Sequence, residues 1–211
     1  MTGEIRQPTV GDLAPAFSVP ALAGGTVRLA AYHGHRNVIL WFSRGFTCPY
    51  CRTSMAGVID GYRRVVDAQA EVIQVSPNLL ESARAFFGNE PVPYAFICDP
   101  DKRLYAVYGL GDHGALAATS AGVVSFARAF TAGDATAQMR GAWFDVVNRN
   151  FLRRLHHHAT SALEQGVFVI DTQGIIRHRL VAGPLDPIPG GAELADLVTA
   201  HCRGPQTPSP A

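Results

Sequence analysis

One stretch of the chain restricts its fold more than any other. An apolar run, NVILWFS (37–43), ends five residues before the first of two cysteines, Cys48 and Cys51. The run lacks polar alternation, which is typical of a central strand that is buried on both faces of a sheet. Residues 49–68 have apolar side chains at spacings of three and four, which predicts an amphipathic helix. The packed stripe of this helix comprises Met55, Val58, Ile59, Tyr62, Val65 and Val66.

Strand and helix patterns alternate along the rest of the chain. The predicted elements are a strand at 71–76, a helix at 78–88, a strand at 94–99, a hairpin at 166–181 and a last helix at 190–202. Thr172-Gln173-Gly174 is the turn signal of the hairpin. This order predicts an α/β fold whose sheet has parallel and antiparallel parts.

The chain has 211 residues, of which 47% are hydrophobic, and this suits a single domain, which we place at residues 1–203. Apolar residues at helical spacing also fill residues 113–164, a stretch that the α/β scheme does not need. We expect a helical insertion there, before the last hairpin. Residues 204–211, GPQTPSPA, are expected to be a disordered tail.

Charge and hydropathy exclude several classes of partner. The formal net charge is +1 and the 18 basic residues are spread along the chain, so we expect no nucleic acid partner. The first residues lack the pattern of a secretory signal, and no apolar run reaches the roughly 20 residues of a membrane span. We therefore expect a cytoplasmic protein without membrane contact. Four cysteines are too few for a disulfide framework, which leaves redox or metal chemistry for the pair.

The position of the pair favours redox chemistry. A thiol where a strand ends and a helix begins lies near unpaired amide hydrogens and the positive end of the helix dipole. In CxxC motifs this lowers the pKa of the first thiol from about 8.5 to roughly 3.5–7.5. Cys48 is thus predicted to be nucleophilic, and Arg44 and Arg52 add positive charge. Cys51, one turn further on, can attack a disulfide or sulfenic acid on Cys48.

A metal site needs two further ligands, and the nearest candidates are His156, His157 and His158, about a hundred residues away. A single CxxC motif is a weak zinc signal, so we expect no metal. A solvated helix face is the favoured interpretation of the three histidines, with an anion-binding or metal-binding lid as the alternative.

Several segments carry a family resemblance: GDLAPAFSVP, NVILWFSRGFTCPYCRTSM, EVIQVSPNLLESARAFF, PYAFICDPDKRLYAVYGLGD and QGVFVIDTQGIIRHRLVAG. Together they resemble the AhpC/TSA (peroxiredoxin-like) branch of the thioredoxin superfamily. RGFTCPYCR and QGVFVID most resemble its peroxiredoxin-like 2 type. The resemblance implies a thioredoxin-like fold with an N-terminal β-extension and a thiol as the reacting group.

The chain departs from the pattern of that family, Pro-x-x-x-Thr/Ser-x-x-Cys. Counted back from Cys51, the threonine place holds Cys48 and the proline place holds Arg44. Counted from Cys48, the same places hold Gly45 and Trp41, so neither frame fits.

Two more departures concern the groups that assist peroxide cleavage. Thr47 lies one residue out of register, and Gln165 occupies the place before GVFVID where the family has an arginine. Because stabilisation of the leaving oxygen is usually a large part of the rate, we expect weak peroxide reduction. The sequence CPYC is shared with glutaredoxins, which gives dithiol–disulfide exchange at least equal support.

The other two cysteines have simpler interpretations. Cys98 lies in the apolar run YAFIC and is expected to be a packed core thiol. Cys202 lies near the C-terminus, where some peroxiredoxins keep a resolving cysteine, but Cys51 already fills that role locally.

The sequence therefore predicts a thiol-dependent oxidoreductase with an antioxidant or disulfide-exchange role. Its candidate catalytic residues are Cys48, Cys51, Thr47, Pro49 and Arg44. By analogy with thioredoxin-type CxxC motifs, Cys48 is the nucleophile and Cys51 the resolving thiol. Under the peroxiredoxin alignment, Cys51 would take the peroxidatic place and the two roles would exchange. The expected substrate is a peroxide or small disulfide and the donor a thioredoxin- or glutathione-type thiol, with no bound cofactor; a homodimer is compatible. The alternative is a non-catalytic redox sensor or partner-binding protein.

Overall fold

The computed structural model describes residues 7–46, 49–88, 92–113, 163–183, 186 and 188–202. A five-stranded sheet with strand order β5-β4-β3-β6-β7 forms its centre, and β1 and β2 form a separate hairpin. The strands are β1 Ser18–Pro20, β2 Thr26–Arg28, β3 Asn37–Phe42, β4 Ala70–Ser76, β5 Ala95–Cys98, β6 Gln165–Ile170 and β7 Ile176–Ala182. The helices are the 3₁₀ turn η1 Leu29–Tyr32 and the α-helices α1 Pro49–Asp67, α2 Leu80–Phe87, α3 Arg103–Val107 and α7 Gly191–His201.

The central position predicted for the first apolar run is confirmed, since β3 lies in the middle of the sheet. All six of its residues are buried. It pairs in parallel with β4, where Ile39 faces Val72, and antiparallel with β6, where Ile39 faces Val169. The sheet thus has the predicted parallel and antiparallel parts.

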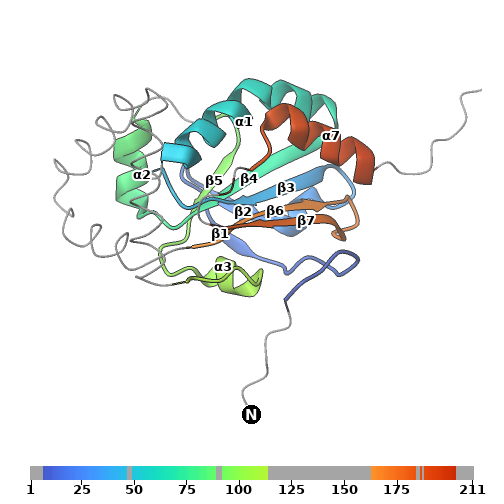
Figure 1. The fold of residues 1–211 in the computed structure, drawn as a ribbon, viewed down its shortest axis with the longest axis horizontal. Coiled ribbons are helices and arrows are strands. Elements are labelled where there is room, and N and C mark those ends of the chain that lie inside the picture. Colours follow the sequence, from blue (N-terminus) through green and yellow to red (C-terminus); the bar gives the residue numbers. More distant parts are fainter. Residues whose placement is uncertain are drawn as a thin grey trace, which may run out of the picture.

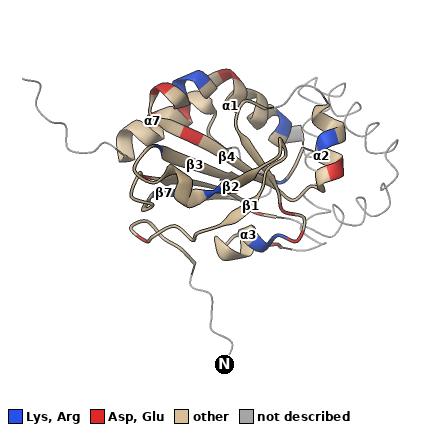
Figure 2. Cartoon of the chain, turned by 180° about the vertical axis from the view of Figure 1, so that it is seen from behind, with Lys and Arg blue, Asp and Glu red and all other residues tan. Residues whose placement is uncertain are grey.

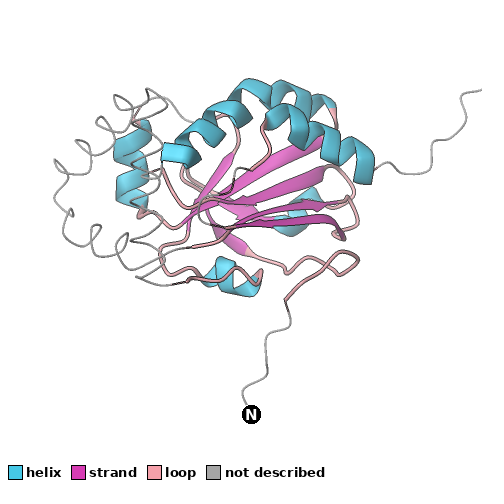
Figure 3. Cartoon of the chain, viewed as in Figure 1, coloured by secondary structure: helices cyan, strands magenta, loops and turns pink. Residues whose placement is uncertain are grey.

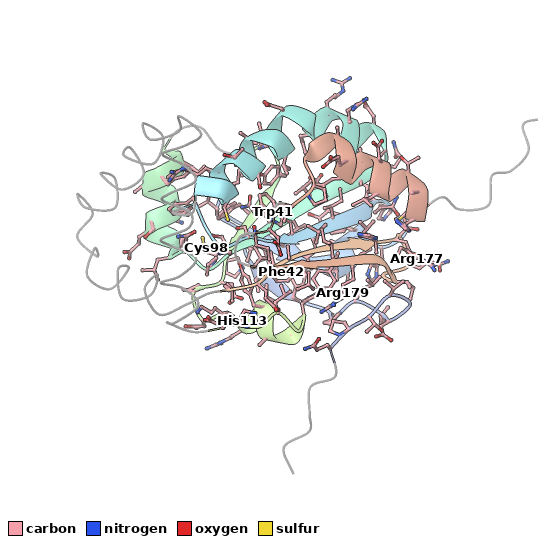
Figure 4. The ribbon with its side chains drawn as sticks, viewed as in Figure 1. Trp41, Phe42, Cys98, His113, Arg177 and Arg179 are labelled. Carbon is pink, nitrogen blue, oxygen red and sulfur yellow. The ribbon has the colours of Figure 1, made fainter. Side chains whose placement is uncertain are left out.

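Helices cover both faces of the sheet, with α1 and α7 side by side on one face and α3 on the other (Figures 1 and 3). Successive side chains of β3 point alternately toward the two faces of the sheet. Trp41 packs in the core under α1 and α7, whereas Phe42 packs in the opposite core (Figure 4). There the rings of Phe42 and Tyr105 of α3 make an edge contact, with centroids 5.0 Å apart. On the first face, α1 packs over β4, and α7 packs over β3 and β6.

The predicted apolar stripe of α1 is largely buried, since Met55 is 4% exposed and Val58 and Val65 are fully buried. The prediction that Ile59 belongs to this stripe is wrong, because its side chain is 40% exposed. Ile59 follows Val58 directly, which rotates it about 100° around the helix and away from the sheet. It lines a surface pocket instead.

The chain enters and leaves the predicted insertion at one place. Asp112 and Leu163 form an antiparallel β-bridge, and the amide of Glu164 donates to the carbonyl of Gly111 over 3.0 Å. His113 Nε2 lies 3.0 Å from Glu164 Oε1. Residues 114–162 between these ends, with His156, His157 and His158, lie outside the described residues, as does the predicted tail 204–211.

Charges of both signs occur together on α1 and on α2 (Figure 2). Among the described residues, no helix combines the length and the apolar character that crossing a membrane requires.

Two glycines allow α1 and α7 to approach closely. A Cβ atom on Gly61 of α1 would lie 2.7 Å from the backbone of Gly191 and Ala192 at the start of α7. A Cβ atom on Gly191 would lie 2.8 Å from Gly61 Cα. Real Cβ atoms essentially never come so near to backbone, so the two helices can cross here only with hydrogen at both positions.

Gly61→Ala should destabilise the protein by about 1–3 kcal/mol, because the added methyl group would push α7 away from α1. The matched control is Gly57→Ala, one turn earlier on α1, where the added Cβ would lie 3.9 Å from Gly190 Cα, an ordinary contact. That variant should gain up to about 1 kcal/mol of helix propensity. Urea unfolding of both variants measures the difference, and equal effects would contradict the close crossing.

A histidine pair joins α7 to β7, since the rings of His178 and His201 lie 4.8 Å apart between centroids. Burial and, second, the charge of His201 lower the pKa of His178 below its ordinary value of 6.5. The folded state therefore binds fewer protons here than the unfolded chain, and stability should fall as the pH drops below about 6.5. His178→Gln should flatten this part of the pH dependence in urea unfolding, and an unchanged profile would exclude His178 as its source.

Candidate active site

Cys51 is the third residue of α1 and its side chain is fully buried. Helix α1 begins at Pro49, as the sequence predicts, and six residues separate it from the end of central strand β3. The first turn of a helix has amide groups without helical partners and the positive end of the helix dipole. Cys51 thus lies in surroundings that suit thiol chemistry, although its sulfur has no contact with solvent.

Two of the predicted site residues, Thr47 and Cys48, lie outside the described residues. The closeness of the Cys48 and Cys51 sulfurs therefore stays a prediction, and so does the placement of the Thr47 hydroxyl.

The sulfur of Cys51 contacts a residue far away in sequence. Cys51 Sγ donates to Gln165 Oε1 over 3.6 Å, and Gln165, the first residue of β6, is 2% exposed. The other end of the same carboxamide donates from Nε2 to the carbonyl of Asp186 over 3.2 Å. The residue that replaces the family's arginine is thus the direct neighbour of the second cysteine.

The loop that leads to the cysteine pair is fixed by Asn78. Its Oδ1 accepts a hydrogen bond from the amide of Phe46 over 3.1 Å and another from the hydroxyl of Ser76 over 2.5 Å. Gly45 has φ +92°, and a Cβ atom there would lie 2.4 Å from Asn78 Oδ1. The backbone at Gly45 therefore requires glycine both for its conformation and for the space that Asn78 occupies.

The side of this loop that faces α1 is held by Arg52 and Phe46. Arg52 Nη1 donates to the carbonyl of Phe46 over 3.1 Å. The ring of Phe46 stacks on Phe86 of α2 with centroids 4.4 Å apart. Loop, α1 and α2 are therefore tied together next to Cys51.

A buried polar network lies beneath the loop. Gln74 Nε2 donates to Ser43 Oγ, and the hydroxyl of Tyr94 donates to Gln74 Oε1, each over 3.0 Å. The hydroxyl of Tyr105 contacts the carbonyl of Ser43 and lies 3.0 Å from that of Val75. Burial, followed by the charges of Asp99 and Cys51, raises the pKa of Tyr105 well above its ordinary value. Tyr105 therefore remains a protonated donor at neutral pH.

Arg44 lies in the same loop and is half-buried. Its Nη1 atom is buried and has no hydrogen-bond partner among the residues that the structure describes. A buried guanidinium nitrogen without a partner is costly unless it serves a bound anion or another ligand. The catalytic role of Arg44 stays a prediction.

A pocket of about 470 Å³ opens beside the start of α1. Its lining is mainly apolar and includes Arg52, Met55, Ile59, Phe86, Phe87 and Val92. Since Arg52 directly follows Cys51 and Met55 lies one turn later, the pocket lies next to the cysteine-bearing turn. The exposed side chain of Ile59 belongs to this pocket.

The two remaining cysteines have unreactive surroundings. Burial raises the pKa of Cys98 to about 11, and burial also raises the pKa of Cys202 to about 11. Both are thiols at neutral pH and therefore poor nucleophiles. Cys98 packs against the core at the end of β5, as predicted, and Cys202 lies at the far end of α7 from the start of α1 (Figure 1).

Asn78, Gln74 and Tyr105 were not singled out by the sequence. Gln74 alone leaves a signal, since it is a polar residue inside the apolar strand EVIQVS. Among the described residues, no group of three or more histidine, cysteine or acidic side chains is placed to hold a metal ion.

The mixed sheet with a cysteine in the first turn of the helix after its central strand defines a thioredoxin-like fold with a candidate thiol site. The AhpC/TSA family model matches residues 10–179. The chain belongs to the AhpC/TSA family.

Known proteins agree with this assignment. Peroxiredoxin Bcp of Escherichia coli K12 is 26% identical over 100 residues, which cover 47% of this chain and 64% of Bcp. The chain thus spans slightly less than two thirds of the length of this relative. Among solved structures, peroxidoxin BcpB from Mycobacterium tuberculosis has a TM-score of 0.61 at 16% identity, covering 92% of this chain and 98% of that one. The reduced 2-Cys peroxiredoxin of Plasmodium vivax has a TM-score of 0.58 at 17% identity, covering 92% and 82%.

Proposed function

We propose that this chain is a thiol-dependent oxidoreductase in which Cys48 is the nucleophile and Cys51 the resolving thiol. The observation that carries the proposal is the complete burial of Cys51 in the first turn of α1. A buried sulfur is out of reach of an external substrate, but it can attack a sulfur that is one turn away in sequence. In this proposal, Cys48 is therefore the thiol that reacts with the external substrate.

With a disulfide substrate, the thiolate of Cys48 attacks one substrate sulfur and forms a mixed disulfide. The other substrate sulfur leaves as a thiolate and takes a proton from water. Cys51 then loses its proton and attacks the Cys48 sulfur, which releases the second substrate thiol and closes the Cys48–Cys51 disulfide. Two electrons pass from the cysteine pair to the substrate, and one dithiol donor of thioredoxin type, or two molecules of a monothiol such as glutathione, restores the pair.

With a peroxide, the Cys48 thiolate attacks one oxygen and the O–O bond breaks. The leaving oxygen takes a proton to become an alcohol or water, and Cys48 becomes a sulfenic acid. Attack by Cys51 then releases water and forms the same disulfide. Arg44 would supply the hydrogen bond for the leaving oxygen, since its buried Nη1 has no partner among the described residues.

The pocket beside α1 favours an organic substrate over hydrogen peroxide in this proposal. Its apolar lining by Met55, Phe86 and Phe87 would accept the carbon part of a disulfide or hydroperoxide, while Arg52 adds a positive charge at its wall. Thr47 and Pro49 would shape the turn that presents Cys48.

Turnover tests the proposal. Reduced protein is mixed with many equivalents of a small disulfide and with one of three donors, a thioredoxin system, glutathione or dithiothreitol. Dithiothreitol needs no recognition by the protein, so it separates lack of catalysis from a wrong donor. We expect many equivalents of disulfide to be consumed per protein above the uncatalysed reaction of the same donor, and no more than that uncatalysed reaction with the Cys48→Ser/Cys51→Ser double variant. Consumption of one equivalent per protein, followed with all three donors by the uncatalysed rate alone, would instead favour a redox sensor.

A further inference from the structure

Gln165 lies at the point where the fold brings strand β6 against the start of α1. Its side chain bridges two groups, the sulfur of Cys51 at 3.6 Å and the carbonyl of Asp186 at 3.2 Å. At 2% exposure, it has almost no contact with water. Each end of the carboxamide therefore has to be satisfied by the protein itself.

The partner at the far end determines which way the carboxamide points. A carbonyl can only accept a hydrogen bond, so the nitrogen of Gln165 must face Asp186 and the oxygen must face Cys51. Asp186 is itself held by Gly183, since its amide donates to the carbonyl of Gly183 over 3.2 Å and its carboxylate accepts from the amide of Gly183 over 2.9 Å. A flip of the Gln165 amide would break the bond to Asp186, so the orientation is built in.

A carboxamide oxygen beside a sulfur favours one protonation state. It accepts a hydrogen bond from a thiol, but it offers only lone pairs to a thiolate. Hydrogen bonding to the neutral form of an acid disfavours its charged form. An arginine at this place, as in the family pattern, would do the opposite, because a guanidinium carries a positive charge and only donates.

We infer that Gln165 is a positioning residue that holds Cys51 as a protonated thiol and thereby exchanges the roles of the two cysteines relative to the peroxiredoxin pattern. Counted along the sequence, Cys51 occupies the peroxidatic place, and it lies beside the residue that replaces the arginine, yet it serves as the resolving thiol. The nucleophile is then Cys48, which stands in the place of the family's threonine. This inference rests on the proposed function.

The inference also gives Gln165 a part in the second half of the cycle. The thiol of Cys51 keeps its proton while Cys48 reacts with the substrate, so the pair does not present two thiolates at once. When Cys51 attacks the Cys48 sulfur, its proton passes to the departing thiolate or hydroxyl group, and the S–H contact to Gln165 Oε1 ends. The carboxamide itself gains and loses no proton.

The test measures the pH at which Cys51 becomes a thiolate, in protein that carries Cys48→Ser. Ultraviolet thiolate absorbance is recorded against pH, and the signal of the Cys48→Ser/Cys51→Ser variant is subtracted to remove Cys98 and Cys202. With Gln165 in place, we expect the thiolate of Cys51 to form only above about pH 8.5, which is the ordinary pKa of a cysteine side chain. Gln165→Arg should increase the acid dissociation constant of Cys51 at least tenfold, because hydrogen bonds to charged groups are the strong ones.

Gln165→Glu provides a second variant of almost unchanged shape. A carboxylate beside the sulfur should lower the acid dissociation constant of Cys51, opposite in sign to arginine, since a like charge disfavours ionisation. The matched control is Gln173→Arg, at the exposed turn after β6, which should leave the titration unchanged. Thiolate present at neutral pH with Gln165, or shifts of the same sign for arginine and glutamate, would overturn the inference.

Failure of the inference and failure of the proposed function give different results. If Cys51 titrates unlike the expectation but Cys48→Ser still abolishes turnover, only the role of Gln165 is wrong. If Cys48→Ser retains turnover, the assignment of the nucleophile is wrong whatever the titration shows.

Discussion

Cys48→Ser should abolish thiol–disulfide exchange, whereas Cys51→Ser should keep the first step and trap a mixed disulfide on Cys48. The physical reason is that Cys51 is fully buried beside Gln165, so it can reach only a sulfur inside the protein. Without Cys51, the mixed disulfide has no internal thiol to release it. Intact-mass measurement after mixing with a small disulfide should show one added half of the substrate on Cys51→Ser and none on Cys48→Ser.

The remaining cysteines supply the controls for this experiment. Cys98→Ser and Cys202→Ser should exchange at the rate of the unaltered protein, because burial raises the pKa of each thiol to about 11. If Cys51→Ser alone loses the first reaction with the oxidant, the nucleophile is Cys51. The peroxiredoxin alignment would then describe the site, and the role assigned to Gln165 would fall with it.

The features that the sequence predicted well are those that depend on neighbours along the chain. The unbroken apolar run before Cys48 is a strand buried on both faces, and Pro49 begins the helix that follows. The hairpin around Gln173 is present because its turn residues and its two flanking runs are contiguous. Ile59 was misplaced because helical spacing identifies a face but not the width of the part that packs.

The features that the sequence could not supply join residues that are far apart along the chain. The contact between Cys51 and Gln165 spans 114 positions, and that between Phe46 and Asn78 spans 32. The crossing at Gly61 and Gly191 depends on two glycines that look like ordinary helix residues. The family resemblance marked Gln165 as a replaced arginine, but only the fold determines that its oxygen faces the sulfur.

Hydrogen peroxide should oxidise the reduced protein about a hundredfold to a thousandfold more slowly than it oxidises Bcp of Escherichia coli under the same conditions. Removing one oxyanion-stabilising donor typically costs that much in rate. Here Gln165 presents an oxygen where the family pattern has a guanidinium, and the hydroxyl of Thr47 is one residue out of register. Stopped-flow fluorescence of the reduced protein, with hydrogen peroxide and a small disulfide compared side by side, measures both rates.

The slow peroxide reaction that remains should depend on Arg44. Its buried Nη1 is a donor without a partner among the described residues, so Arg44→Ala should slow peroxide oxidation by a further tenfold or more, roughly the cost of a hydrogen bond to a charged group. Disulfide exchange should change much less, because a departing thiolate needs less stabilisation than a departing alkoxide. Arg84→Ala, an exposed arginine on α2, is the matched control and should affect neither rate. A peroxide rate equal to that of Bcp and unaffected by Arg44→Ala would show that the site cleaves the O–O bond without Arg44 and without the arginine that Gln165 replaces. It would refute the predicted preference for disulfides over peroxide.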